Sequence, residues 1–216
     1  MEKENQMKQK YSVIVFDLGK VLLPFDFNDV VQGFEEKEKG LGVKFGNFYK
    51  TNYEVHRKFE RGEYTVDEFT KIMLDVLEGK VDKDEFYRIY SGLFSVNEGL
   101  VGLLPVLKKN YRLVVLSNTN AIHMKYGWGS YDFLGNFEKL ILSHEVGSVK
   151  PEQKIYEAVE SYTGVPSQEH LYTDDISEYI AAARSRGWDA VQFIGNKELI
   201  GEFGKRGIIL DGSSRD

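Results

Sequence analysis

Short runs of apolar residues recur along the chain, separated by stretches in which the apolar residues follow a helical spacing. The runs lie at residues 11–16, 112–117, 139–143, 171–173 and 190–194. They are almost continuously apolar, as expected of strands that are covered on both faces. We therefore predict five strands of a parallel sheet, and we expect residues 207–210 to add a short sixth strand.

The helical spacing is clearest between residues 65 and 79. Thr65 and Glu68 have the spacing of a capping box, and Gly79 follows as a stop signal. Between them, apolar residues recur at intervals of three and four and form one helix face: Phe69, Ile72, Met73, Val76 and Leu77. Strands that alternate with such helices are typical of an α/β fold with a parallel sheet.

About ninety residues between the first two strand candidates contain no convincing strand. One further helix is expected to begin at Asp26 or Asn28, and another at Asp82. A crossover between parallel strands needs only one helix, so we predict that a four-helix insertion forms a separate lid. The predicted organisation is a disordered tail over residues 1–10, a core formed by residues 11–25 and 100–216, and an inserted helical domain over residues 26–99.

Composition and charge narrow the class of protein. Apolar residues make up 42% and charged residues 29% of the 216 residues, as in an ordinary soluble globular protein. The net charge is −6 and the basic residues are scattered, so nucleic acid is not an expected partner. The absence of cysteine excludes disulfides and thiolate metal sites, and no apolar run approaches the roughly 18 residues of a membrane span. We expect a cytoplasmic protein without a signal peptide or membrane anchor.

Polar residues stand where three of the strand candidates end. Asp17 follows the first strand, Ser117 ends the second, and the pair Asp174 and Asp175 follows the fourth. In open parallel sheets, ligands bind beyond the carboxyl ends of the strands. These side chains are therefore expected to share one edge of the sheet.

A lysine is expected to join them. Pro151, after the third strand, suits the first turn of a helix, which would place Lys150 at its N-terminal, anion-attracting end. Three neighbouring carboxylates repel one another unless a cation joins them, and all-oxygen ligation suits Mg²⁺. The combination fits attack of Asp17 on phosphorus, which gives an aspartyl phosphate that water then hydrolyses. Each residue taken singly has a commoner structural role, as a cap, a turn residue or solvated surface, and only the ordered set predicts a site.

This ordered set resembles the four motifs of the haloacid dehalogenase-like (HAD) hydrolase superfamily. The resemblance covers nearly the whole chain, and the helical insertion stands where that superfamily carries its α-helical cap. Three segments are most similar to the bacterial sugar-phosphatase group typified by α-D-glucose-1-phosphate phosphatase: FDLGKVLLPFDFN, LSNTN and KPEQKIYEAV. The resemblance implies a Rossmann-like core, a helical cap, a Mg²⁺ cofactor and hydrolysis of phosphomonoesters.

The resemblance also implies how a phosphoryl group would be handled. Asp17 would be the nucleophile and would also bind the metal. Ser117 and Asn118 would hold the phosphoryl oxygens, and Lys150 would neutralise their charge. The expected partner is thus a small phosphorylated metabolite rather than a macromolecule.

The remaining metal ligands implied by the resemblance are Asp174, Asp175 and the backbone carbonyl of Gly19. Of the two acids, Asp175 is the one expected to bind the metal directly. Most of these phosphatases carry a second Asp where this chain has Gly19. That acid protonates the leaving group and later activates water. Gly19 keeps the carbonyl and loses the carboxylate, so the metal site should survive.

The missing acid affects the rate and the choice of substrate. General acid–base catalysis is typically worth about 10²–10⁴-fold, a small part of the enhancement of up to about 10²¹-fold known for phosphate monoesters. A leaving group that needs little protonation is favoured, and the anomeric hydroxyl of a sugar 1-phosphate is one. His123 and His144 are candidate substitute acids, although a lone histidine is more often structural. Lys20 is expected to point into solvent rather than to bind an anion.

Three other functions share parts of this pattern. A metal-independent 2-haloacid dehalogenase would also lack an acid at Gly19, but such enzymes generally lack the pair Asp174–Asp175. A phosphotransferase or mutase usually relies on the missing second acid. A non-catalytic module that binds a phosphorylated metabolite is favoured only by Gly19, because the other motif residues are intact.

Selection of the substrate is expected from the helical insertion, because the sheet edge handles only the phosphoryl group. Phe25 and Phe27 lie near the nucleophile in the sequence, and Tyr53 and Arg57 belong to a probable insertion helix that could reach a sugar. The remaining aromatic residues of the insertion lie at helical spacing and are expected to pack against one another.

Overall fold

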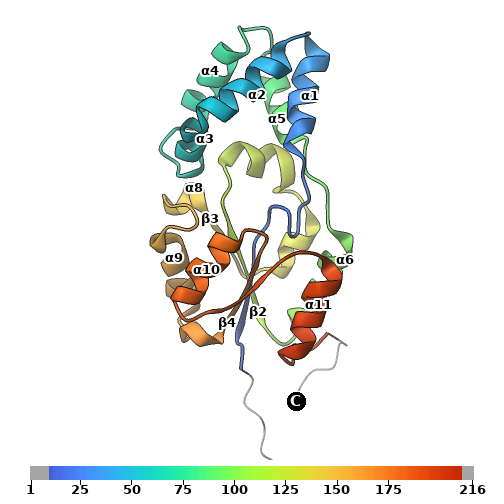
Figure 1. The fold of residues 1–216 in the computed structure, drawn as a ribbon, viewed down its shortest axis with the longest axis vertical. Helices are drawn as coiled ribbons and strands as arrows, with labels where there is room; N and C mark the ends of the chain where they lie inside the picture. The colour runs from blue at the N-terminus through green and yellow to red at the C-terminus, as the bar shows by residue number, and fades with distance from the viewer. Residues whose placement is uncertain (1–9, 211–216) are drawn as a thin grey trace, which may run out of the picture.

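The computed structural model describes residues 10–210, and its core is a parallel five-stranded sheet in the order β3-β2-β1-β4-β5 (Figure 1). The strands are β1 (Val13–Phe16), β2 (Arg112–Ser117), β3 (Lys139–Leu142), β4 (His170–Asp174) and β5 (Asp189–Gln192). This confirms the predicted fold class and five of the strands. The predicted tail over residues 1–10 lies outside the described residues except for Lys10.

The predicted sixth strand is wrong. Gly207 has a left-handed φ of 69°, and the residues after it pair with no strand in the part of the chain that the structure describes. Ile208 and Ile209 are buried instead, and the Ile209 N–H donates to the Tyr111 hydroxyl at 3.2 Å. Their apolar character therefore reflects burial in the core and not a place in the sheet.

Helices cover both faces of the sheet, which explains the almost continuous apolar character of the strands. Val13 and Val15 of β1 pack against α9 (Gln153–Thr163) and α10 (Ser177–Ser185). Ile14 and Phe16 point to the other face, where α6 (Glu98–Val101), α7 (Leu104–Leu107) and α11 (Asn196–Lys205) pack. Alternate side chains of one strand thus enter two separate apolar clusters.

The insertion contains five helices and not the four that we predict from the sequence. They are α1 (Phe27–Lys37), α2 (Leu41–Thr51), α3 (Tyr53–Glu60), α4 (Val66–Val76) and α5 (Lys83–Ser91). The additional helix arises because Asn52, with φ −124° and ψ 36°, interrupts the helical stretch between residues 41 and 60. Helix propensity alone does not show such a break.

The predicted helix starts are confirmed where a side chain caps the helix. The Asp26 carboxylate accepts from the Asn28 N–H, and Asp82 accepts from the Glu85 N–H. Thr65 and Glu68 form a complete capping box at α4. These contacts satisfy N–H groups that a helix leaves without an internal partner.

The helices α1–α5 stand over the carboxyl end of the sheet (Figure 1). Their aromatic residues pack on one another around a buried cluster that includes Phe34, Phe45, Phe69, Phe86 and Tyr90. The expected packing role of these rings is therefore confirmed. The domain boundaries at residues 25/26 and 99/100 stay a prediction. Within the described residues, no helix has the length and apolar character needed to cross a bilayer.

Candidate functional site

The central strand β1 delivers Asp17 to the carboxyl edge of the sheet. The strand ladder continues one residue beyond β1, because the Asp17 N–H donates to the Thr173 carbonyl at 2.9 Å. The neighbouring strands β2 and β4 end in Ser117 and Asp174, so the topology brings these side chains beside Asp17. Only 7% of Asp17 is exposed to solvent.

Lys150 links the carboxylates at this edge. Its ammonium group donates to Asp17 Oδ1 at 2.7 Å, to Asp174 Oδ2 at 2.6 Å and to the Leu116 carbonyl at 3.1 Å. These three bonds use all three donors of the group. The side chain is buried, with 1% of the residue exposed.

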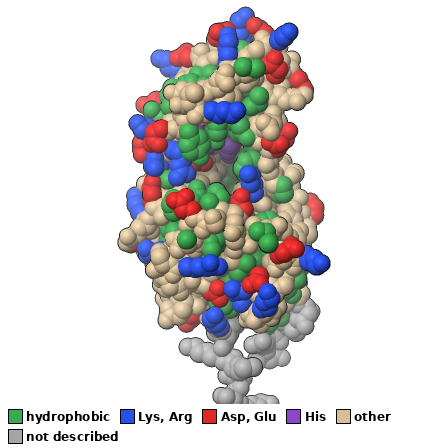
Figure 2. Space-filling view, viewed as in Figure 1, with side chains coloured by type: hydrophobic (Ala, Val, Ile, Leu, Met, Phe, Trp, Pro, Cys, Tyr) green, Lys and Arg blue, Asp and Glu red, His purple; other side chains and the backbone are tan. Residues whose placement is uncertain are grey.

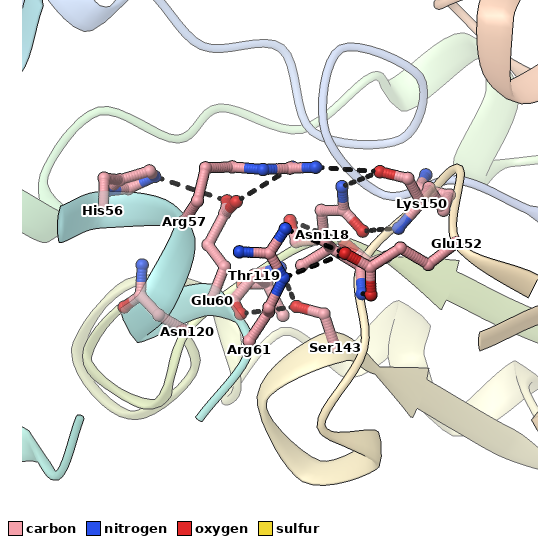
Figure 3. Close-up of polar contacts among 12 residues, drawn as sticks. His56, Arg57, Glu60, Arg61, Asn118, Thr119, Asn120, Ser143, Lys150 and Glu152 are labelled. Carbon is pink, nitrogen blue, oxygen red and sulfur yellow. Dashed lines mark hydrogen bonds and ion pairs between the residues drawn. The ribbon is translucent and has the colours of Figure 1, made fainter. Parts of the chain in front are cut away.

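The predicted place of Lys150 at a helix N-terminus is wrong, because α9 begins at Gln153 and Pro151 precedes it. The Asn118 side chain holds the Lys150 backbone instead. Asn118 Oδ1 accepts from the Lys150 N–H at 2.7 Å, and Asn118 Nδ2 donates to the Lys150 carbonyl at 3.1 Å. The same carbonyl accepts from Arg57 Nη2 at 3.0 Å (Figure 3). The expected contact of Asn118 with a phosphoryl group stays a prediction.

The two acids after β4 differ in their surroundings. Both oxygens of the buried Asp174 are engaged, one by Lys150 and the Tyr172 hydroxyl, the other by the Ile176 N–H at 2.8 Å. The Asp175 side chain is half-buried, and its carboxylate accepts no such bond from another residue of the described range 10–210, although its backbone carbonyl accepts from Gln192. Asp175 is therefore the freer of the two acids to bind a metal directly.

Asp17, Asp174 and Asp175 form a cluster that suits a divalent cation. Each offers a carboxylate oxygen, and these atoms lie within 4.8 Å of one another. Burial raises the pKa of Asp17 to about 8, against the pull of Lys150 and with a further rise from Asp174. Burial and the charge of Asp174 also raise the pKa of Asp175. One lysine does not balance three carboxylates, and an all-oxygen donor set is the one that Mg²⁺ prefers.

Lys150 stays charged in this cluster. Burial alone would lower the pKa of Lys150, but the attraction of Asp17 and Asp174 outweighs it and the pKa is raised. A buried ammonium group beside Asp17 is suited to hold an anionic group there. Ser117 is also buried at this edge, and its hydroxyl lies 3.4 Å from the Asn118 carbonyl.

A cavity of about 210 Å³ opens above these residues, between the sheet edge and the helices α1–α5. Figure 2 shows it as a hollow that apolar and basic side chains surround, with a histidine visible inside. Four residues that the sequence suggested for substrate selection line this cavity: Phe25, Phe27, Tyr53 and Arg57. Their contact with a substrate stays a prediction.

The packing around Gly19 leaves little room for a side chain. A Cβ atom at this position would lie 3.0 Å from Cε1 of Phe25. The neighbouring Lys20 is exposed, as expected, but it also lines the cavity, with its Nζ 5.6 Å from the centre of the Phe25 ring. The Phe25 ring therefore occupies space beside Gly19 that a side chain at this position would need.

The two histidines considered as substitute acids lie in different places. His123 begins a π-helical turn (His123–Trp128) and lines the cavity, whereas His144, on the short helix α8 (Ser143–Val146), does not. Burial lowers the pKa of His123 to about 3, so its ring is neutral at neutral pH. A neutral imidazole with such a low pKa is a poor proton donor, which argues against His123 as the general acid.

Sequence reasoning missed two polar residues of α3 that line the cavity. His56 and Glu60 are buried, and His56 Nε2 lies 3.3 Å from Glu60 Oε1. A signal was present in the sequence, because polar residues four positions apart flank Phe59 on the face that an amphipathic helix buries. Tyr49, Trp128 and Tyr179 also line the cavity and were not predicted.

No family model matches the chain. Among curated proteins, the D-ribitol-5-phosphate phosphatase of Bacteroides thetaiotaomicron is 28% identical over 190 residues, which cover 83% of this chain and 90% of that protein. This relative is a phosphatase by its name, and the solved structures below bear on the fold.

Among solved structures, a HAD family enzyme from Bacteroides thetaiotaomicron in complex with magnesium and inorganic phosphate superimposes with a TM-score of 0.74 at 24% identity. The alignment covers 84% of this chain and 93% of that one. A protein described as a predicted HAD-like family hydrolase from Porphyromonas gingivalis gives a TM-score of 0.76 at 19% identity, over 91% and 97% of the two chains. These likenesses show a shared fold.

Proposed function

We propose that the chain is a haloacid dehalogenase-like hydrolase and a Mg²⁺-dependent phosphatase of a small phosphorylated metabolite. The 28% identity to a curated phosphatase and the fold shared with a HAD family enzyme support this proposal. The substrate class is a sugar or polyol phosphate, and a sugar 1-phosphate suits the absence of an acid at Gly19. One observation carries the proposal: Lys150 bridges Asp17 and Asp174 in a buried cluster with Asp175, at the open end of the central strand.

The residues of this cluster support a two-step reaction. The Asp17 carboxylate attacks phosphorus, and the new oxygen–phosphorus bond forms as the bond to the leaving oxygen breaks. Lys150 donates to Oδ1 of Asp17, so the other oxygen, Oδ2, is the one placed to attack. Water then attacks phosphorus, which releases inorganic phosphate and restores the carboxylate. The leaving alkoxide takes its proton from solvent, because Gly19 supplies none.

The metal would be held by Asp17, Asp174, Asp175 and the Gly19 carbonyl, with Asp175 as the more direct acid. When bound, Mg²⁺ supplies positive charge that offsets the carboxylates and stabilises the charge on the phosphoryl oxygens. Ser117 and the backbone of Asn118 lie at the same edge and are proposed to hold those oxygens, beside Lys150. Asn118 also positions Lys150 through its side chain.

Two other functions remain as outcomes of the test. A metal-independent 2-haloacid dehalogenase would also work without an acid at Gly19, but it has no use for the cluster of three carboxylates. A non-catalytic module would bind a phosphorylated metabolite without turnover. The cluster and the buried lysine favour the phosphatase over both.

A phosphate-release screen over a panel of phosphorylated metabolites tests the proposal, with and without Mg²⁺. Wild type is expected to release phosphate only with Mg²⁺, and Asp17→Asn is expected to lose at least about 10³-fold of this activity, because the nucleophile is removed. Asp189→Asn is the matched control. Asp189 begins β5, pairs with Arg206 and does not line the cavity.

Three results would change the proposal. No release by wild type on any substrate would favour the binding module. Halide release from a 2-haloacid without metal would favour the dehalogenase. Undiminished release by Asp17→Asn would mean that another group, or a contaminant, performs the reaction.

A further inference from the structure

A buried ionic cluster on α3 faces the cavity and has no part in the steps above. Glu60 is 8% exposed and lines the cavity. Its Oε1 lies 3.3 Å from His56 Nε2, and its Oε2 lies 3.4 Å from Arg57 Nη1 (Figure 3). A carboxylate is rarely buried at a cavity wall without a function or a partner, because burial of a charge is costly.

Glu60 is ionised in this setting. Burial by itself would raise the pKa of Glu60, but the charges and hydrogen bonds of His56 and Arg57 outweigh it and lower the pKa. Each oxygen of Glu60 has one of these partners, and a carboxylate oxygen can accept a second hydrogen bond. The group is therefore an acceptor with capacity left for a molecule in the cavity.

Asn120 orients the neighbouring His123. The Asn120 Oδ1 accepts from the N–H groups of Ile122 at 3.1 Å and His123 at 3.0 Å, which fixes the amide orientation. Its NH₂ group then faces His123 Nδ1 at 3.2 Å and donates to it. The ring proton of His123 is consequently on Nε2, which is enclosed and has no hydrogen-bond partner among residues 10–210. An enclosed donor without a partner costs free energy that a ligand acceptor would recover.

The same amide group is connected to the histidine beside Glu60. Asn120 Nδ2 lies 3.4 Å from the Tyr90 hydroxyl, which lies 3.2 Å from His56 Nδ1. The fully buried Asn120 thus links the two histidines on the cavity wall, because it contacts His123 directly and His56 through the Tyr90 hydroxyl.

The cluster lies beyond the phosphoryl site and within reach of a bound leaving group. Glu60 lines the same cavity as Asp17 and Lys150. Arg57 lies between Glu60 and Lys150, because it contacts Glu60 with Nη1 and the Lys150 carbonyl with Nη2. One arginine side chain therefore separates the Glu60 carboxylate from the residue that holds the phosphoryl group.

We infer that Glu60 and His123 form a hydroxyl-binding subsite, in which Glu60 accepts from and His123 Nε2 donates to hydroxyl groups of the leaving group. The subsite selects a leaving group with several hydroxyls, as in a polyol or sugar chain. Arg57 already balances the charge of Glu60, so a neutral hydroxyl suits the subsite better than an ammonium group. This inference rests on the proposed function, because it specifies the substrate of the same cavity.

The test compares a polyol phosphate with a phosphate ester that lacks hydroxyls. For wild type and Glu60→Gln, kcat/KM is measured with ribitol 5-phosphate and with phenyl phosphate. Glu60→Gln weakens a hydrogen bond to a charged group. The ratio of kcat/KM for ribitol 5-phosphate to kcat/KM for phenyl phosphate should therefore fall by about 10-fold or more. Glu160→Gln is the matched control, since Glu160 is a partly buried carboxylate held by Arg186 and Trp188 outside the cavity.

A second pair of variants removes the donor instead of the acceptor. His123→Phe keeps an aromatic ring beside Tyr90. Because the donor is lost, the same ratio should fall by about 10-fold. This variant also tests the inference if Glu60→Gln does not fold. His144→Phe is its control, because His144 also has an enclosed nitrogen without a partner among the described residues but does not line the cavity. Thermal unfolding of all four variants establishes that they are folded.

The outcomes separate this inference from the proposed function. A wild type that hydrolyses phenyl phosphate without preferring ribitol 5-phosphate, or an unchanged ratio in both Glu60→Gln and His123→Phe, overturns the inference and leaves the phosphatase standing. If wild type hydrolyses neither ester, calorimetry decides. Weaker binding of ribitol 5-phosphate, but not of inorganic phosphate, by Glu60→Gln supports the subsite without the phosphatase, and equal binding overturns it.

Discussion

At the scale of single residues, Gly19 stands where most of the phosphatases that the chain resembles carry a second Asp. Phe25 packs against this glycine. The Phe25 ring fills the space beside Gly19, with Cε1 only 3.0 Å from the position of an added Cβ. Phe25 is itself held by an edge-to-face contact with Phe94, at 5.8 Å between ring centres. The loss of the carboxylate is therefore part of the local packing, and restoring it requires a second change.

Gly19→Asp alone is expected to give little gain in kcat, because Phe25 must move before the carboxylate can turn toward the leaving group. In combination with Phe25→Leu, kcat for an alkyl phosphate should rise by at least about 10-fold, which is less than the roughly 10²–10⁴-fold typical of general acid–base catalysis. Steady-state kinetics of both single variants and the double variant measure this. A double variant no faster than Phe25→Leu contradicts the expectation.

The residue scale also shows what the sequence could predict about the site. Asp17, Ser117 and Asp174 were predictable because each stands at a strand end that parallel topology brings to one edge, whereas Lys150 lies in the connection before α9. The role of the Asn118 side chain was not, since its partner lies 32 positions away and the contact exists only in the folded chain. The cluster around Glu60 is local in the sequence, and it was missed because its burial at the cavity wall exists only in the folded chain, although its polar residues left a trace in the helical pattern.

At the scale of elements, α3 is one of the helices of the insertion that contact the rest of the chain. Arg61, just beyond α3, pairs with Glu152 ahead of α9 at 2.8 Å. Gly62 follows with φ +71°, and a Cβ there would lie 2.4 Å from the His144 carbonyl of α8. The end of α3 thus abuts α8 so closely that only glycine fits.

Gly62→Ala is expected to lower the free energy of unfolding by more than the roughly 1–2 kcal/mol of a left-handed alanine, because it also displaces α3 from α8. Gly79→Ala is the matched control, since Gly79 has φ +64° but nothing within 4 Å of the added Cβ. Urea denaturation and kcat/KM of both variants provide the comparison. Equal losses of stability, with kcat/KM unchanged in both, would show that the contact with α8 is unimportant.

Element types were more predictable than element limits. Strands and capped helix starts depend on neighbouring residues, so Asp26, Thr65 and Asp82 mark helix starts correctly. The break at Asn52 lies on the exposed surface, where Asn52 bonds to Phe48 and Thr51, and no simple pattern marks it. The irregular backbone of residues 207–210 goes with the burial of Ile208 and Ile209 against distant parts of the chain. Local patterns therefore gave the architecture but not the number of helices in the insertion.

At the scale of the whole molecule, the site lies where the strand order reverses. The chain proceeds from β1 toward β2 and β3 on one side, and β4 and β5 lie on the other, so Asp17 and Asp174 stand on either side of the switch point. The helices α1–α5 stand over this point (Figure 1), and the cavity lies between them and the sheet edge. In the proposed function, the sheet edge performs the phosphoryl chemistry and the helices above it recognise the leaving group.

The carboxylate cluster makes the stability of the molecule sensitive to Mg²⁺. A cation at about 100 times its Kd adds about 2.7 kcal/mol, which corresponds to a rise of roughly 5–10 °C in Tm for a chain of this size. Thermal unfolding with Mg²⁺ and with a chelator should show this rise in wild type and in Asp189→Asn, and a smaller one in Asp175→Asn. An identical Tm in both conditions would contradict binding of the metal at Asp17, Asp174 and Asp175.

The central claim is that Asp17 forms a covalent bond to phosphorus, and acid quenching followed by peptide mass spectrometry tests it most directly. Gly19 offers no carboxylate to activate water, so the second step should be slow and the intermediate should accumulate. After brief mixing with Mg²⁺ and ribitol 5-phosphate, we predict one phosphoryl group on the peptide that contains Asp17, sensitive to hydroxylamine and absent from Asp17→Asn. Release of phosphate without this adduct, or with an adduct on another residue, would contradict the account.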